Sequence, residues 1–204
     1  MARSLASNHD DKRLRIIEVA AALFASASFE AARMQDIAAA CNVSKSALYH
    51  YFPSKEVLLH VIISEHIMNA VQELEAIAHG PGTAKERLTQ LARAMVKRAA
   101  EHRHEHMVLT NDLKFLPALH QQEIKLAQAR ALEFVIELLT EINPHLMRRR
   151  REGASYALFL YGSMISTATW YRRGGGMTPH ELADRLTEVF LNGFDGGDHP
   201  PGFR

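Results

Sequence analysis

Side chains that can donate hydrogen bonds to phosphates or to base edges gather near the N-terminus of the chain. They are the hydroxyl, ammonium and imidazole groups of Ser44, Lys45, Ser46, Tyr49, His50, Tyr51 and Lys55. Ser44 is a residue type preferred just before the first turn of a helix, so most of these donors would follow on one short helix. Such a set of donors suits contacts with the backbone and groove edges of a nucleic acid.

Two short helices and a tight turn must position these donors. Apolar spacing predicts one helix over about residues 34–41 and a second over about 44–51, with the turn at Asn42. Asn tolerates the left-handed backbone of such a turn better than other residues except Gly. Pro53 ends the second helix because its ring cannot continue a helical interior. The segment 34–53 is therefore predicted to be a helix-turn-helix.

Composition limits the class of protein but does not by itself indicate DNA binding. The 204 residues carry a net charge of +1 and a single cysteine, Cys41, which we expect to be a small core residue. The apolar stretch 16–29 is interrupted by Glu18, so we expect no signal peptide. No segment reaches the roughly 18–20 apolar residues of a membrane span. We therefore expect a soluble, cytoplasmic protein that contacts no membrane.

Apolar spacings of three and four residues continue along the chain and predict an all-α fold. An amphipathic helix is expected over residues 12–27, and a long one from the helix-turn-helix to about residue 79. Further helices are expected over about 83–103, 118–142, 147–173 and 179–194, with a segment closed by Pro117 between the first two. Thr178, Pro179 and Glu181 together predict a capping box at the start of the last helix.

The helix-turn-helix resembles the N-terminal signature of the TetR family. The matching residues are Ile37-Ala38, Val43-Ser44-Lys45, Leu48-Tyr49-His50-Tyr51-Phe52 and Lys55, within a similarity over about residues 12–70. The resemblance implies that the second short helix enters the major groove of a double-stranded operator. The DNA-binding residues are then expected to be Arg33, Ser44, Lys45, Ser46, Tyr49, His50, Tyr51 and Lys55.

Three residues depart from the family pattern. Ser28 and Asn42 stand where the family has Gly, and Ala32 stands where it has Thr. Without the Thr, the first short helix is expected to lack its usual cap and one phosphate contact, which Arg33 could replace.

The resemblance also implies two domains and a dimer. A three-helix DNA-binding domain is expected over residues 11–71 and a helical effector-binding and dimerisation domain over 72–195, followed by a disordered tail over 196–204. The last two long helices carry more apolar surface than one subunit covers. We therefore expect a homodimer on a palindromic operator. Its interface would include Leu160, Tyr161, Leu186, Val189 and Phe190.

Two C-terminal segments are similar to family members that respond to acyl-coenzyme A. Residues 169–183 resemble the ending of such regulators, and residues 111–117 resemble a segment of the repressors of phenylacetate degradation. An acyl or aryl chain would suit a pocket with aromatic and thioether surface. That pocket is expected to include Asn111, Phe115, Phe134, Met164, Trp170 and Tyr171, although these aromatic residues could instead be core. No cofactor is expected apart from this effector.

Two alternatives stay open on the sequence alone. A helical-bundle metalloenzyme needs two Glu-x-x-His motifs, and we find one, Glu101 to His104. His102 and His106 are one helical turn apart and could share a metal, but alternating histidines point to different faces, so His104 cannot join them. One such pair with polar surface around it is weak evidence, and we predict no metal site. The second alternative is a dimeric structural protein that binds no operator. We expect a ligand-released repressor without enzyme activity.

Overall fold

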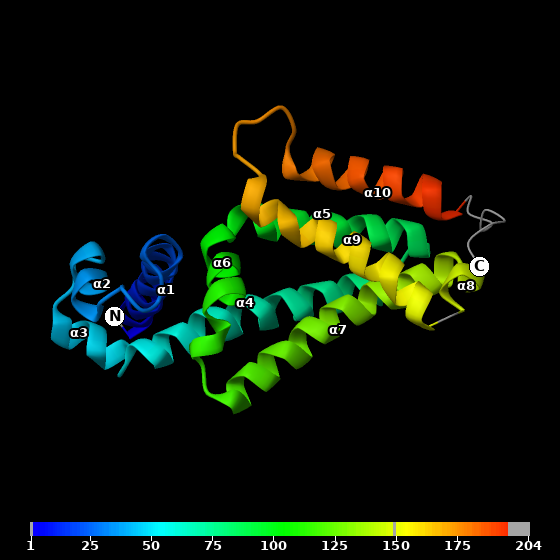
Figure 1. The fold of residues 1–204 in the computed structure, drawn as a ribbon. Coiled ribbons are helices and arrows are strands. Elements are labelled where there is room, and N and C mark those ends of the chain that lie inside the picture. The colour runs from blue at the N-terminus through cyan, green and yellow to red at the C-terminus, as the bar shows by residue number, and fades with distance from the viewer. Residues whose placement is uncertain (1, 149, 196–204) are drawn as a thin grey trace. The chain divides into compact units, whose positions relative to one another are not determined.

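The computed structural model describes residues 2–148 and 150–195, and these form helices joined by short loops (Figure 1). In chain order they are α1 (Ala2–Ala27), α2 (Met34–Ala40), α3 (Lys45–Tyr51), α4 (Lys55–Ala78), α5 (Ala84–Glu101), α6 (Arg103–Asp112), the 3-10 turn η1 (Leu113–Phe115), α7 (Ala118–Ile142), α8 (Pro144–Met147), α9 (Arg150–Trp170) and α10 (Pro179–Asp195). The two described ranges contain no strand, which confirms the all-α prediction. The predicted tail over 196–204 lies outside them.

The helices form two compact units. Unit 1 runs to Ile67 and includes His102–Lys125, while unit 2 comprises Met68–Glu101 and the chain from Leu126 onward. Helix α6 belongs to unit 1 because it packs against α1. A division of the chain at residue 71 puts α6 with the C-terminal helices, whereas α6 packs in unit 1. The predicted domain boundaries themselves stay a prediction.

A buried apolar face of α1 organises the core of unit 1. Ile16, Ala20 and Phe24 recur every four residues and are at most 1% exposed. Ile37 of α2 and Leu48 of α3 are both fully buried. Removing each large side chain of this kind from water contributes about 1.5–3 kcal/mol, so the short helices α2 and α3 are held by packing rather than by their own length.

In unit 2, α5 packs against both α9 and α10 (Figure 1). Arg93 of α5 joins it to α10, because its Nε and Nη2 donate to the two carboxylate oxygens of Asp184 at 2.6 and 2.8 Å. The predicted capping box is confirmed: the Thr178 N–H donates to Glu181 Oε2 at 2.7 Å, and the Glu181 N–H donates to Thr178 Oγ1 at 3.2 Å. Pro179 is the first residue of α10, as predicted.

The start of α1 and the segment after α7 differ from the prediction. Helix α1 begins at Ala2 rather than near residue 12, since its polar first turns contain no Pro or Gly to stop it. Pro144 ends α7 as expected but also begins α8, where the Asn143 side chain caps the Leu146 N–H at 3.1 Å. None of the helices in the described ranges is long and apolar enough to cross a membrane.

Candidate functional site

The turn between α2 and α3 has the backbone that the sequence predicts. Asn42 has φ +54°, in the left-handed region. The Val43 N–H donates to the Ala38 carbonyl and the Asn42 N–H donates to the Ala39 carbonyl, each at 3.0 Å. This pair of hydrogen bonds is a Schellman ending, which satisfies the last carbonyls of α2 and sets the direction in which α3 starts.

Helix α3 presents its donors on the side opposite the core. Ser44 caps it as predicted, because its Oγ accepts the Ala47 N–H at 3.1 Å. Leu48 anchors the helix inward at 0% exposed, while Lys45 and Tyr49 lie on the outer face. Ser46 and His50 are also exposed. The Lys45 ammonium lies 5.9 Å from the centre of the Tyr49 ring, one helical turn away.

The loop before α2 contains the other departures from the family pattern. Ser28 has φ +74°, a left-handed backbone that a Gly would adopt more easily. Arg33, and not Ala32, occupies the cap position of α2, and its side chain makes no cap hydrogen bond. The Arg33 side chain is exposed.

Lys55 makes hydrogen bonds within its own chain, and its predicted contact with DNA stays a prediction. Its ammonium donates to the carbonyl oxygens of Phe29 at 2.7 Å, Ala32 at 3.1 Å and Glu30 at 3.3 Å. These three acceptors use the three protons of the ammonium group. Lys55 therefore holds the loop between α1 and α2, and a DNA phosphate would have to compete with that loop for it.

Arg33, Lys45 and Tyr49 converge on one open hollow of about 600 Å³. Its other walls include Glu30 from the loop and Glu56 from the first turn of α4. Tyr51 is placed elsewhere: it is half-buried, and the His9 ring of α1 packs on it with ring centres 4.6 Å apart. The two cations and the phenol thus form one outward-facing polar group.

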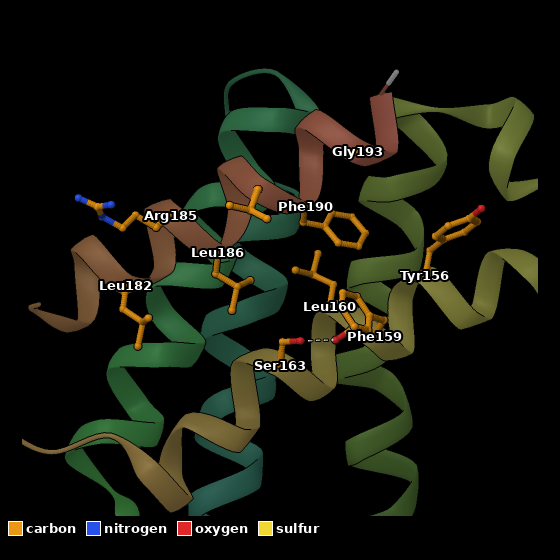
Figure 2. Close-up of a pocket in the computed structure, with 10 residues that line it drawn as sticks. Tyr156, Phe159, Leu160, Ser163, Leu182, Arg185, Leu186, Phe190 and Gly193 are labelled. Carbon is orange, nitrogen blue, oxygen red and sulfur yellow. Dashed lines mark hydrogen bonds between the residues drawn. The ribbon is translucent and has the colours of Figure 1, made fainter. Parts of the chain in front are cut away.

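A second hollow, of about 640 Å³, lies between α9 and α10 (Figure 2). Phe159 and Val189 on its walls are 70% and 75% exposed, although both are apolar. The rest of its lining is Tyr156, Leu160, Ser163, Leu182, Arg185, Leu186, Phe190 and Gly193. We call this surface the α9–α10 groove. Exposed apolar area of this kind marks a contact surface.

The predicted dimer residues divide between this groove and the core. Leu186, Val189 and Phe190 line the groove, and the Phe190 ring stacks near that of Phe159 with centres 6.4 Å apart. Leu160 lines its floor but is 0% exposed. Tyr161 packs against the core of its own unit, where burial raises the pKa of its phenol.

The residues predicted for an effector pocket line neither of these hollows. Phe134 and Met164 are 0% exposed in the core of unit 2. Trp170, the last residue of α9, is 53% exposed, and the Tyr171 hydroxyl donates to the Met177 carbonyl at 3.1 Å. In unit 1, Asn111 is exposed, and Phe115 packs on Phe29 with ring centres 5.1 Å apart. Phe134 and Met164 therefore pack in the core of unit 2 and Phe115 packs on Phe29, while an effector pocket formed by these six residues stays a prediction.

The histidines singled out in the sequence lie at the start of α6. His102 is the residue just before α6 and lies 3.8 Å from the Glu105 carboxylate, while His106 is half-buried, and this burial lowers the pKa of its imidazole. Sequence analysis missed Asp112, which is 4% exposed and accepts a hydrogen bond from the Phe29 backbone. Burial raises the pKa of the Asp112 carboxyl, and the Phe29 N–H opposes that shift.

Both parts of the chain match known protein families. Residues 16–62 match the family described as bacterial regulatory proteins, tetR family, and residues 81–194 match the family described as Tetracyclin repressor-like, C-terminal domain. The chain belongs to the TetR family. A solved TetR-family regulator from Bordetella parapertussis 12822 is 30% identical, with a TM-score of 0.83 over 88% of this chain and 94% of that one.

Two other relatives carry more specific names. The transcriptional repressor KstR2 of Mycobacterium tuberculosis is 25% identical over 193 residues, which cover 93% of this chain and 96% of KstR2. The regulator AibR, solved in complex with isovaleryl coenzyme A and operator DNA, has the same fold, with 22% identity and a TM-score of 0.74 over 87% of this chain and 97% of AibR. Membership of the TetR family makes this chain a DNA-binding transcriptional regulator and not an enzyme.

Proposed function

We propose that this chain is a homodimeric repressor, which binds operator DNA through α3 and leaves it when an acyl- or aryl-acyl-coenzyme A is bound. The observation that carries the proposal is the outer face of α3, where Lys45 and Tyr49 stand exposed on a helix fixed by the Ser44 cap and by buried Leu48. A rigid helix with exposed donors is what readout in the major groove requires.

Each exposed donor of this face has a distinct proposed part in DNA binding. Arg33 and Lys45 neutralise phosphates on the two sides of the hollow that they share with Tyr49. The Tyr49 phenol combines an apolar ring with a hydroxyl donor, so it can position the helix against the sugar–phosphate backbone. Ser46 and His50 extend the exposed face along α3. Tyr51, which packs on His9 of α1, positions α3 against α1.

A second copy of this chain is the proposed occupant of the α9–α10 groove. Phe159 and Val189 on its walls are mostly exposed, and this apolar surface comes from the two helices through which the TetR family dimerises. Two identical copies related by a two-fold axis would each cover the other's groove. Such a dimer places two copies of α3 on the two halves of a palindromic operator.

The effector class rests on similarity. AibR is described with an acyl-coenzyme A thioester, and residues 169–183 of this chain resemble the ending of family members that respond to such thioesters. A thioester can lift repression only if it binds the conformation that cannot engage DNA more tightly than the one that can. The proposal therefore concerns the chemical class of the effector. Phe134 and Met164 are core residues, and we assign none of the six predicted residues to the effector pocket.

Gel-shift assays with the DNA just upstream of the gene test the proposal directly. The protein is titrated alone and with phenylacetyl-, isovaleryl- or long-chain acyl-coenzyme A, with free coenzyme A as the control. Binding that one thioester abolishes and free coenzyme A leaves intact is the expected result. Binding that no thioester changes would overturn the effector class but keep the regulator, and absence of specific binding would favour a dimeric structural protein.

A further inference from the structure

Three potential metal ligands from two helices meet inside unit 1. His60 comes from α4, and His120 and Glu123 come from the first turns of α7. Their nearest ligand atoms all lie within 4.8 Å of one another. His120 and Glu123 are three residues apart, a spacing that puts both side chains on one face of α7, toward His60.

The two imidazoles are close together, and one nitrogen of His120 lacks a hydrogen-bond partner among the described residues. Their rings stack with centres 3.8 Å apart and planes 11° apart, so neither ring directs a hydrogen bond at the other. The Nδ1 atom of His120 is buried and has no hydrogen-bond partner within residues 2–148 and 150–195. A buried polar atom without a partner is costly in a folded protein, and coordination to a metal is one way to satisfy an imidazole nitrogen.

We propose that His60, His120 and Glu123 bind a divalent transition-metal ion, with zinc the best match, and that this ion ties α4 to the start of α7. Two imidazoles and a carboxylate are a donor set that zinc accepts, with a fourth position open to water or another small ligand. His60 and His120 are half-buried and Glu123 is exposed, so an ion can enter from solvent.

Coordination requires a small rearrangement of the imidazoles. Ligand atoms about 2.0–2.2 Å from one tetrahedral ion lie little more than about 3 Å apart, closer than the 4.8 Å within which these atoms now lie. Stacked rings cannot both point a nitrogen at one ion, so the rings must turn apart about their side-chain bonds. The other histidine group of unit 1 is a poorer site, because the His66 ring centre lies 6.2 Å from that of His102 and 5.9 Å from that of His106.

Zinc titration of the full-length protein by calorimetry tests the site, after the protein has been stripped with a chelator. One zinc ion per chain is expected to bind the unmodified protein. His60→Gln, His120→Gln and Glu123→Gln are each expected to weaken that affinity at least tenfold, while His104→Gln, which changes an exposed histidine of α6, leaves it unchanged. Cobalt substitution gives a second readout, since four-coordinate cobalt absorbs visible light and Glu123→Gln should abolish that band.

Two results would overturn the proposal. One is unmodified protein that binds no zinc in a fixed ratio. The other is zinc binding that the three variants retain, or that His104→Gln weakens as much as they do, because surface histidines would then hold the ion. Circular dichroism checks that each variant folds, and Glu123→Gln is the decisive one because its side chain is exposed and its loss removes a ligand without opening the core. Zinc should raise the melting temperature of the unmodified protein and not that of Glu123→Gln.

Discussion

The ammonium nitrogen of Lys55 lies 2.7 Å from the carbonyl oxygen of Phe29 and 4.4 Å from the centre of the Phe29 ring. The first residue of α4 thereby closes the loop that leads into the helix-turn-helix. Phe29 is held from α6 and η1 as well, because its N–H donates to the buried Asp112 carboxyl of α6 and Phe115 of η1 packs on its ring. The loop before α2 is therefore fixed by side chains from two other helices of unit 1.

Replacing Lys55 by Met should destabilise the protein. The change removes the hydrogen bonds to three loop carbonyls, two of them at buried residues, Phe29 and Ala32. Leaving such acceptors without a donor costs about 1–3 kcal/mol. Calorimetry or chemical denaturation of Lys55→Met should show a lower free energy of unfolding, and operator affinity should fall because the loop no longer fixes α2.

Lys45→Met is the matched control, since Lys45 is exposed and makes no hydrogen bond to a carbonyl in the described residues. It should change the free energy of unfolding by less than about 0.5 kcal/mol. If Lys45 contacts a phosphate, the slope of log affinity against log salt should decrease by about 1. Lys55→Met should keep the original slope; a slope reduced in Lys55→Met instead would mean that Lys55 contacts DNA after all.

Tyr49→Ala should weaken operator binding severely without affecting dimerisation. The ring is 40% exposed on α3 and lies on the hollow shared with Arg33 and Lys45, so its removal opens no core cavity. Gel shifts measure the affinity, and sedimentation measures the dimer. Unchanged affinity in Tyr49→Ala would show that another face of the helix-turn-helix meets the DNA.

Ser28→Gly should stabilise the protein by up to about 1 kcal/mol. Ser28 has φ +74°, which costs a residue with a Cβ roughly 1–2 kcal/mol relative to right-handed backbone, and Gly avoids most of that cost. Ser26→Gly is the comparison, because Ser26 lies inside the last turn of α1, where Gly is disfavoured by about 0.5 kcal/mol. Denaturant titration should therefore show opposite signs for the same substitution two residues apart, and equal signs would contradict the assigned strain.

Features set by a few neighbouring residues could be predicted from the sequence. The left-handed Asn42 and the Ser44 cap depend on their own backbone segment, as does the capping box at Thr178. The box at Thr83 and Glu86 follows the same pattern, with the Thr83 N–H donating to Glu86 Oε2 at 2.8 Å, and was not recognised although its spacing is visible. Capping boxes of this kind can be predicted from the sequence because the two residues that hydrogen-bond are three residues apart.

Features that depend on how helices pack could not be predicted. The sequence places Lys55 near DNA-contacting residues, but its actual acceptors lie more than twenty residues upstream. Whether Phe134 lines a pocket or fills the core depends on which helices cover it, and periodicity does not reveal that. His60 and His120 are also brought together by packing alone, and spacing along one helix, which drew attention to His102 and His106, does not reveal such a pair.

Lowering the pH should destabilise unit 1 through His106. Burial lowers the pKa of this imidazole below its ordinary value of 6.5, so the folded protein favours the neutral ring. Protons then bind the unfolded chain more readily, and stability that is complete above about pH 6.5 is lost as the pH falls toward the folded pKa. One such group lowers the free energy of unfolding by at most about 1.4 kcal/mol per pH unit.

Denaturant titrations at pH 7.5 and 5.5 measure this loss. His106→Gln should show a smaller loss than the unmodified protein, while the exposed His104→Gln should show the same loss. His60 adds to the total in all three proteins, because burial and the neighbouring His120 lower its pKa too. An undiminished loss in His106→Gln would assign the acid sensitivity to His60 or to other groups.

If the proposed dimer forms through the α9–α10 groove, Val189→Asp should give a folded monomer. Val189 is 75% exposed on the wall of the α9–α10 groove, so a carboxylate there is tolerated in one chain but would lose its contact with water against a second copy. Sedimentation should show the monomer mass, and operator affinity should fall because a single helix-turn-helix engages only half of a palindrome. Leu126→Asp is the control, since Leu126 is 63% exposed on α7 outside the groove and its replacement should leave the dimer intact. A Val189→Asp protein that remains a dimer would place the interface on a different surface.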